Sequence, residues 1–176
     1  MDVLDTPSER LASMNDLLLY RLSQLSALAG AMVVRLCEGG YGITRREWGV
    51  LAQLQGQSEG LLPSALAEAM GRDRARTSRI LAGLLRKGLI ERQTQPHDRR
   101  SVRVRLSPAG QALYDALMPQ VQAINARILS VLAPVQKQAL DGALEQLRLQ
   151  ARQLLDELGP ELPKADRRRG RRPVGQ

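Results

Sequence analysis

The sequence has few aromatic residues: they make up 2% of its 176 positions, and Phe is absent. The hydrophobic fraction is nevertheless 43%, which is enough for an apolar core. That core must consist of Leu, Val, Ile, Ala and Met, a composition that favours helices over a sheet-rich fold.

Cysteine and histidine occur once each, as Cys37 and His97. A single cysteine excludes an intramolecular disulfide framework, and no residues have the spacing of a metal cluster. The sequence also lacks a glycine loop of the phosphate-binding type. We therefore expect no metal, no cofactor and no enzymatic activity.

Long apolar runs are absent as well. No run approaches the roughly 18–20 residues that a membrane span requires. The first ten residues, MDVLDTPSER, are acidic and polar, unlike a signal peptide. The sequence predicts a cytoplasmic protein without a membrane partner.

The positive charge is unevenly distributed. The net charge is +8, and residues 72–105 alone hold eleven Lys and Arg against three Asp and Glu. Residues 164–176 add six basic residues and one acidic residue, so the remainder of the chain is net acidic. This pattern favours a polyanionic partner, with a solvated charged face as the alternative.

Three long amphipathic helices are predicted near the two ends, because apolar residues recur at steps of three and four. The first stops at Gly39–Gly40, and a break near Pro134 separates the other two. A second copy of the chain would cover the apolar stripes of these helices in a symmetric dimer. An intramolecular helical bundle is the alternative. The stripes comprise Leu18, Leu22, Leu25, Ala29, Met32 and Leu36; Leu113, Leu117, Val121, Ile124, Ile128 and Val131; and Leu140, Leu144, Leu147, Ala151, Leu154 and Leu158.

Capping signals predict short helices between these stripes. Thr44 and Glu47 have the spacing of a capping box, and Pro63 suits the first turn of a further helix. Asp73 can cap the next helix, which Gly88 ends. Two helices joined by a short, glycine-containing turn are typical of a helix-turn-helix.

A β-hairpin is expected next, with Ile90–Gln95 extended and Pro96–Arg100 as its turn. Apolar and basic residues alternate strictly over Val102–Leu106, as in a strand with one buried face. Ser107 and Pro108 then begin a helix. The fold class is mainly α with a small β-hairpin wing. The expected parts are a flexible N-terminus (1–9), an N-terminal dimerisation helix (10–38), a winged helix-turn-helix lobe (43–107), C-terminal dimerisation helices (108–159) and a disordered basic tail (160–176).

The helix after Asp73 is the predicted recognition helix of a DNA-binding protein. Its N-terminal half would approach base edges in the major groove, where arginine can bond O6 and N7 of guanine together. The alternative is that its arginines pair with the few nearby acids. Its core side would be Thr77, Leu81 and Leu84 with Ile80 beside them, and its far side Arg76, Arg79, Gly83 and Arg86. The candidate DNA contacts are Ser64, Arg72, Arg74, Ala75, Arg76, Thr77, Arg79 and Arg86 on the two helices and the turn between them, and Asp98, Arg99 and Arg100 at the hairpin.

The hairpin tip carries Arg99 and Arg100, and a basic tip can enter the minor groove. Asp98 is expected to accept hydrogen bonds within the turn and hold its shape, since DNA would repel an anion. His97 is interpreted as a solvated turn residue.

The stretch from Thr44 to Gly110 resembles the MarR family of regulators. The similarity is carried by EWGVLAQL, ALAEAMGRDRARTSRIL, RKGLIER and DRRSVRVRLSPAG, of which the last matches the family's wing signature. With the flanking helices it extends over roughly residues 10–158. The chain departs from the usual pattern at Arg72 and Thr77, where leucine and valine are common, and at Gly83, where a charge is common.

The resemblance implies a homodimer that binds a near-palindromic operator and is often released by a small aromatic or phenolic ligand. The family's pockets would correspond here to Arg35, Tyr41 and Trp48, although Trp48 also suits a core position. Cys37 is interpreted as structural, because Glu38 beside it would raise the thiol pKa.

The sequence therefore predicts a bacterial, sequence-specific transcription regulator, a repressor that binds double-stranded DNA as a homodimer. The alternative is an architectural protein that binds nucleic acid without sequence preference. Base readout discriminates the two, because a regulator prefers its site over random duplex by about 10³-fold or more.

Overall fold

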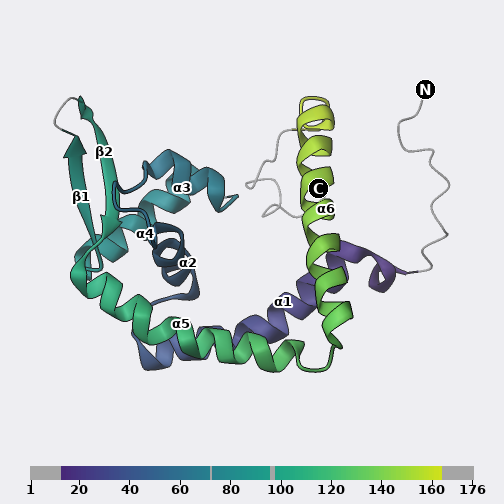
Figure 1. Cartoon of the computed structure of the whole chain (residues 1–176). Coiled ribbons are helices and arrows are strands. Elements are labelled where there is room, and N and C mark those ends of the chain that lie inside the picture. The colour runs from purple at the N-terminus through teal and green to yellow at the C-terminus, as the bar shows by residue number, and fades with distance from the viewer. Residues whose placement is uncertain (1–12, 72, 96–97, 164–176) are drawn as a thin grey trace, which may run out of the picture. The chain divides into compact units, whose positions relative to one another are not determined.

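The computed structural model describes residues 13–71, 73–95 and 98–163 (Figure 1). The predicted flexible N-terminus, Arg72, His97 and residues 164–176 of the predicted tail lie outside this part. The chain divides into two compact units, residues 1–128 and 129–176.

The first unit is mainly helical and carries one antiparallel β-hairpin, which confirms the predicted fold class. Figure 1 shows the hairpin beside three short helices, α2, α3 and α4. The elements are a 3₁₀ turn (Met14–Asp16), α1 (Leu18–Arg35), a π-helical turn (Leu36–Gly40), α2 (Arg45–Leu54), α3 (Pro63–Ala69), α4 (Arg74–Arg86), β1 (Ile90–Gln95), β2 (Asp98–Leu106) and α5 (Pro108–Leu129).

The predicted helix starts are confirmed by their hydrogen bonds. At α2, the Thr44 hydroxyl accepts from the Glu47 amide, and the Glu47 carboxylate accepts from the Thr44 amide at 2.7 Å. Asp73 Oδ1 accepts from the Arg76 amide at 2.7 Å at the start of α4. Ser107 Oγ accepts from the Gly110 amide at 3.0 Å at the start of α5. Each cap satisfies an amide that would otherwise lack a partner within its helix.

The hairpin pairs Ile90 with Leu106 at its base and Gln95 with Asp98 at its far end. The predicted turn over 96–100 is therefore too long, because the second strand already begins at Asp98. Alternation of apolar and basic residues made Val102–Leu106 recognisable, but Asp98–Ser101 lack that alternation. Backbone pairing extends the strand beyond the sequence signal.

Residue Leu61 adds a single bridge to the edge of this hairpin. Its amide and carbonyl both bond to Val104, each at 2.9 Å. The preceding Gly60 has φ +66°, and a Cβ on it would lie 2.7 Å from the Val104 carbonyl oxygen. Glycine is required here both by the left-handed backbone and by the close approach of the strand.

The core lies where α2, α4, the hairpin base and α5 meet. The Trp48 ring stacks on Tyr114 of α5, with ring centroids 5.1 Å apart and planes inclined by 21°. The other principal residues of the core are aliphatic, as the composition requires. The buried aliphatic residues are Ile43, Val50, Leu51, Leu54, Leu66, Leu81, Leu84, Ile90, Val104 and Leu117.

The second unit contains α6 (Pro134–Leu158), which starts at the predicted break. None of its residues is buried, and leucines of the predicted stripe, including Leu144 and Leu147, are exposed. Within the described residues, no helix combines the length and apolar character needed to cross a membrane.

Candidate nucleic-acid interface

The two sides of α4 differ in chemistry, as the sequence predicts. Leu81 and Leu84 are buried on one side, where α4 packs against α2 and α3. The predicted contact residues of the other side are exposed: Arg74, Ala75, Arg76, Arg79 and Arg86. Capping by Asp73 fixes where the helix begins, and so places Arg74, Arg76 and Arg79 along its first turns, whereas Arg86 lies in its last turn.

Thr77 does not belong to the exposed side, and its inclusion among the candidate contacts is wrong. It is 1% exposed, and its hydroxyl donates to the Asp73 carbonyl at 3.2 Å. The side chain fills the core under the start of α4. A threonine bonded back to the preceding turn can be buried without an unpaired hydroxyl.

The α4 arginines leave their guanidinium groups at the surface. Arg79 Nε makes a long 3.4 Å contact to the Ala75 carbonyl. Glu91, one of the acids that could have neutralised them, instead pairs with Arg105 across the hairpin at 2.6 Å. Ser64 is exposed in the first turn of α3, the helix that precedes the turn to α4.

The wing contacts remain predictions. The backbone of Asp98–Arg100 belongs to β2, but the side chains of these residues lie outside the described part of the structure. Further down the strand, Arg103 donates from a terminal nitrogen to the Gly60 carbonyl at 3.1 Å. The side chains of Arg103 and Arg105 therefore form contacts inside the protein, to Gly60 and Glu91 respectively, near the base of the hairpin.

A partly buried ion pair joins α2 to the end of α4, and the sequence did not reveal it. Lys87 Nζ donates to Glu47 Oε2 at 2.8 Å and to the Gly42 carbonyl at 2.9 Å. Burial raises the pKa of Glu47, but bonds from Lys87 and Thr44 outweigh burial and hold that pKa below its ordinary value. The capping-box spacing was the available signal for Glu47, whereas nothing local identified Lys87 as its partner.

Gly83 was expected on the exposed far side of α4, and that expectation is wrong. It is half-buried, and a Cβ built on it would lie 3.0 Å from Glu47 Oε1. A larger residue would press on the carboxylate. The departure from the common charged residue thus has a local steric cause.

The candidate ligand residues are already engaged by the protein. The Tyr41 hydroxyl donates to the Ala116 carbonyl at 3.2 Å and accepts from the Gln120 amide, both on α5. Trp48 is 8% exposed and stacked on Tyr114. Arg35 is exposed at the end of α1. A ligand at the two aromatic residues would have to replace contacts with α5.

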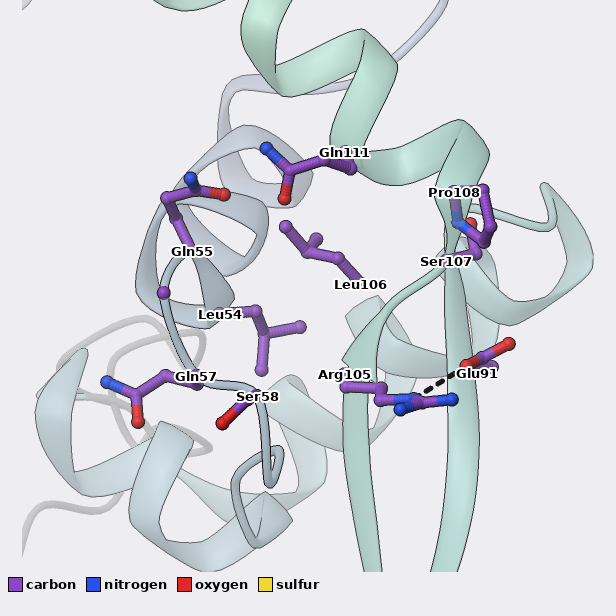
Figure 2. A pocket seen from close by; sticks show the side chains of 11 residues that line it. Leu54, Gln55, Gln57, Ser58, Glu91, Arg105, Leu106, Ser107, Pro108 and Gln111 are labelled. Carbon is purple, nitrogen blue, oxygen red and sulfur yellow. Dashed lines mark hydrogen bonds and ion pairs between the residues drawn. The ribbon is translucent and has the colours of Figure 1, made fainter.

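An open pocket of about 580 Å³ lies elsewhere, and Figure 2 shows its lining. The loop after α2, the base of the hairpin and the start of α5 surround it. Leu54 and Leu106 supply apolar surface, and the Arg105–Glu91 pair lies at one end. Arg35, Tyr41 and Trp48 do not line this pocket.

The cysteine is buried and its thiol pKa is raised, first by burial and then by the charge of Glu38, against a smaller opposite effect of Arg45. A thiol with a raised pKa is a poor nucleophile at neutral pH, which agrees with a structural role for Cys37. Among the described residues, no group of three or more His, Cys, Asp or Glu is placed to hold a metal ion.

Comparison with known proteins shows which family the lobe that carries this surface is similar to. Residues 41–101 match the model of the MarR family. A protein of Thauera aromatica assigned to transcriptional regulation of the hcr operon is 38% identical over 110 residues, which is 60% of this chain. The matched part spans 63% of that relative's length.

Solved structures share the fold. A MarR-family transcriptional regulator from Silicibacter pomeroyi is similar with a TM-score of 0.65 and 26% identity, over 82% of this chain and 92% of that one. The MepR–DNA complex of S. aureus gives a TM-score of 0.70 at 22% identity, over 76% and 98% of the two chains. The sequence match falls on the helix-turn-helix and hairpin, and the structural match also extends beyond them. Residues 41–101 are thus similar to the MarR family, and a solved MarR-family regulator shares the fold.

Proposed function

We propose that this protein is a transcription regulator that binds a palindromic operator in double-stranded DNA as a homodimer. The observation that carries the proposal is the two-sided character of α4. Its inner side is fixed in the core through Leu81 and Leu84, while Arg74, Arg76 and Arg79 are exposed on the N-terminal half. A rigidly mounted helix with exposed arginines suits base readout in the major groove.

Other contacts would add affinity more than specificity. Ser64 and Arg86 are exposed near the two ends of the α3–α4 segment, where phosphate contacts are expected. On the basis of the sequence, further DNA contacts are proposed for Arg72, Arg99 and Arg100. Asp98 is proposed to keep the shape of the hairpin turn. Phosphate contacts fix register on the duplex and make binding depend on salt.

Dimerisation is proposed because apolar residues remain uncovered on helices of both units. Leu18, Leu25 and Met32 of α1 are 46%, 55% and 45% exposed. Leu144 and Leu147 of α6 are 41% and 43% exposed. A monomeric protein rarely exposes stripes of this length, and a two-fold symmetric dimer would bury them and present two copies of α4.

Repression relieved by a small aromatic or phenolic effector is proposed on the family resemblance. Arg35, Tyr41 and Trp48 remain its candidate site, and ligand binding there would loosen α5 from Tyr41. Intrinsic tryptophan fluorescence can test whether an effector binds at this site, because Trp48 is the sole tryptophan. An effector bound beside Trp48 would change its emission together with DNA affinity.

Selection of bound duplexes from a random pool tests the main proposal. We expect a recovered palindrome whose half-site centres lie about 10 base pairs apart, because two-fold symmetry presents two equivalent helices about one turn apart. The palindrome should bind at least about 10³-fold more tightly than random duplex at physiological salt. Binding without a preferred sequence would instead indicate an architectural protein.

A further inference from the structure

The end of α4 is attached to α2 by an ion pair whose two residues are not among the proposed DNA contacts. The Lys87 ammonium donates to Glu47 Oε2 at 2.8 Å and to the Gly42 carbonyl at 2.9 Å. Glu47 Oε2 also accepts from the Thr44 amide at 2.7 Å. One ammonium group thus connects the end of α4, the first turn of α2 and the segment that precedes α2.

Gly83 makes room for this pair. It precedes Lys87 by four residues, so the two positions lie on one side of α4, one turn apart. A Cβ at Gly83 would lie 3.0 Å from Glu47 Oε1, which is tighter than an ordinary contact. The glycine lowers helix propensity but lets the carboxylate lie against the helix backbone.

The environment strengthens the pair. The Glu47 side chain is 9% exposed and the Lys87 side chain 38% exposed. Charge-assisted hydrogen bonds are stronger than neutral ones, and removal of either partner from a partly buried pair leaves an uncompensated charge. The position of α4 against α2 is therefore sensitive to this contact.

We propose that Glu47, Gly83 and Lys87 form a lock that sets the orientation of α4 on the lobe and thereby its discrimination between operator and random DNA. The proposal rests on the proposed function of α4. Lys87 is a positioning residue, because it acts through the helix and not through a DNA contact.

Orientation matters more for base contacts than for phosphate contacts. Hydrogen bonds to base edges are short and directional, so a small rotation of α4 would misalign Arg76 and Arg79. Attraction to phosphates tolerates such a shift, since it depends on charge at longer range. Loss of the lock should reduce operator affinity while leaving affinity for random duplex almost unchanged.

The experiment compares two duplexes of equal length, the palindrome selected by the wild-type protein and a random sequence. Lys87→Met removes the ammonium and keeps an unbranched apolar side chain, and Lys87→Arg restores a cation. Arg46→Met is the matched control, because Arg46 is exposed on α2 and its loss removes the same charge. Dissociation constants are measured at a temperature where circular dichroism shows every variant folded.

We expect Lys87→Met to lower the operator-to-random affinity ratio about tenfold, the effect of one charge-assisted hydrogen bond. Arg46→Met should leave that ratio unchanged, and Lys87→Arg should restore most of it. Glu47→Gln, which preserves side-chain shape, should also lower the operator-to-random affinity ratio. This variant tests the proposal independently if Lys87→Met does not fold.

Two results separate the inference from the proposed function. If the wild-type protein prefers the palindrome but Lys87→Met and Glu47→Gln keep its ratio, the lock has no role in recognition and the inference is overturned. Equal weakening on both duplexes overturns it as well. If the wild-type protein selects no sequence at all, the proposed function itself is wrong.

Discussion

Helices α4 and α6 are both amphipathic, yet among the described residues Leu81 and Leu84 of α4 are buried and most leucines of the α6 stripe are exposed. Leu84 of α4 is 0% exposed, whereas Leu144 and Leu147 of α6 are 41% and 43% exposed. The α4 stripe packs against α2, α3 and β1, while no residue of α6 is buried. The same sequence pattern therefore produces a completed core in one region and an uncovered surface in the other.

The difference indicates separate roles for the two helices. An apolar stripe gains its stabilisation only when water is removed from it, at roughly 25 cal/mol per Å². The lobe around α4 gains that stabilisation in a single chain, so it can hold an exposed basic side rigidly. The α6 stripe would gain it on association, which makes its contribution depend on protein concentration.

The largest effect is expected from charges placed in the α6 stripe. Leu144→Asp combined with Leu147→Asp would put two unpaired carboxylates into the proposed dimer interface, at several kcal/mol each. The dimer dissociation constant should rise about 10³-fold or more, as measured by sedimentation equilibrium. Gln146→Asp, on the same helix between them, is the control. A dimer that survives the double substitution would contradict the role assigned to this stripe.

A core truncation in α4 should act on the folded lobe itself. Leu84→Ala leaves a cavity at a fully buried site and should lower the free energy of unfolding by about 2–5 kcal/mol. Leu147→Ala is the matched truncation at an exposed site. Its effect on urea unfolding should appear mainly as altered dependence on protein concentration. Similar, concentration-independent losses in both variants would remove the distinction between the two helices.

The exposed sides of the helices can be compared through their arginines. Arg76→Ala should weaken operator binding by about 1–3 kcal/mol and relax preference at one base pair. Arg148→Ala on α6 is the control, because Arg148 is exposed and pairs with Glu145 at 2.6 Å. Fluorescence anisotropy with the operator and a random duplex measures both. Equal loss on the two duplexes would argue against base readout by Arg76.

The smallest effect concerns the pH dependence of the lobe. The pKa of Glu47 lies below its ordinary value in the folded protein, because bonds from Lys87 and Thr44 outweigh its burial. Its ionised form therefore stabilises the fold above the ordinary glutamate pKa, and the stabilisation is lost as pH falls through the lowered pKa. Glu47→Gln should be less stable than wild type at pH 7 by about 1 kcal/mol. Urea unfolding should show this difference shrinking as pH falls through the lowered pKa of Glu47, and a difference that stays constant with pH would contradict it.

Much of the lobe could be predicted because its signals are local. Thr44, Asp73 and Ser107 cap helices through bonds to amides three residues away, so spacing alone identifies them. Alternation located Val102–Leu106 of β2, but it did not predict the start of the strand over Asp98–Ser101, where no alternation exists. The exposed state of Arg76 and Arg79 followed from helical periodicity.

The sequence-based predictions that the structure contradicts concern residues whose environment is set by other elements. Thr77 was both a core residue and a candidate DNA contact on sequence grounds, and packing under Asp73 decided that it is buried. Gly83 was assigned to the exposed side of α4, but Glu47 of α2 lies against it. Periodicity gives the angle of a side chain around its own helix and does not say what faces it.

The sequence by itself determined which segments are helices, where most of them start, and that positive charge accumulates over 72–105. These properties follow from caps and periods within a few residues. The tertiary structure decided that Lys87 binds Glu47 and Gly42 across about 40 residues of chain. It also decided that Trp48 stacks on α5 and that, among the described residues, no side chain of α6 is buried. Such contacts depend on how distant elements pack, and no local pattern encodes them.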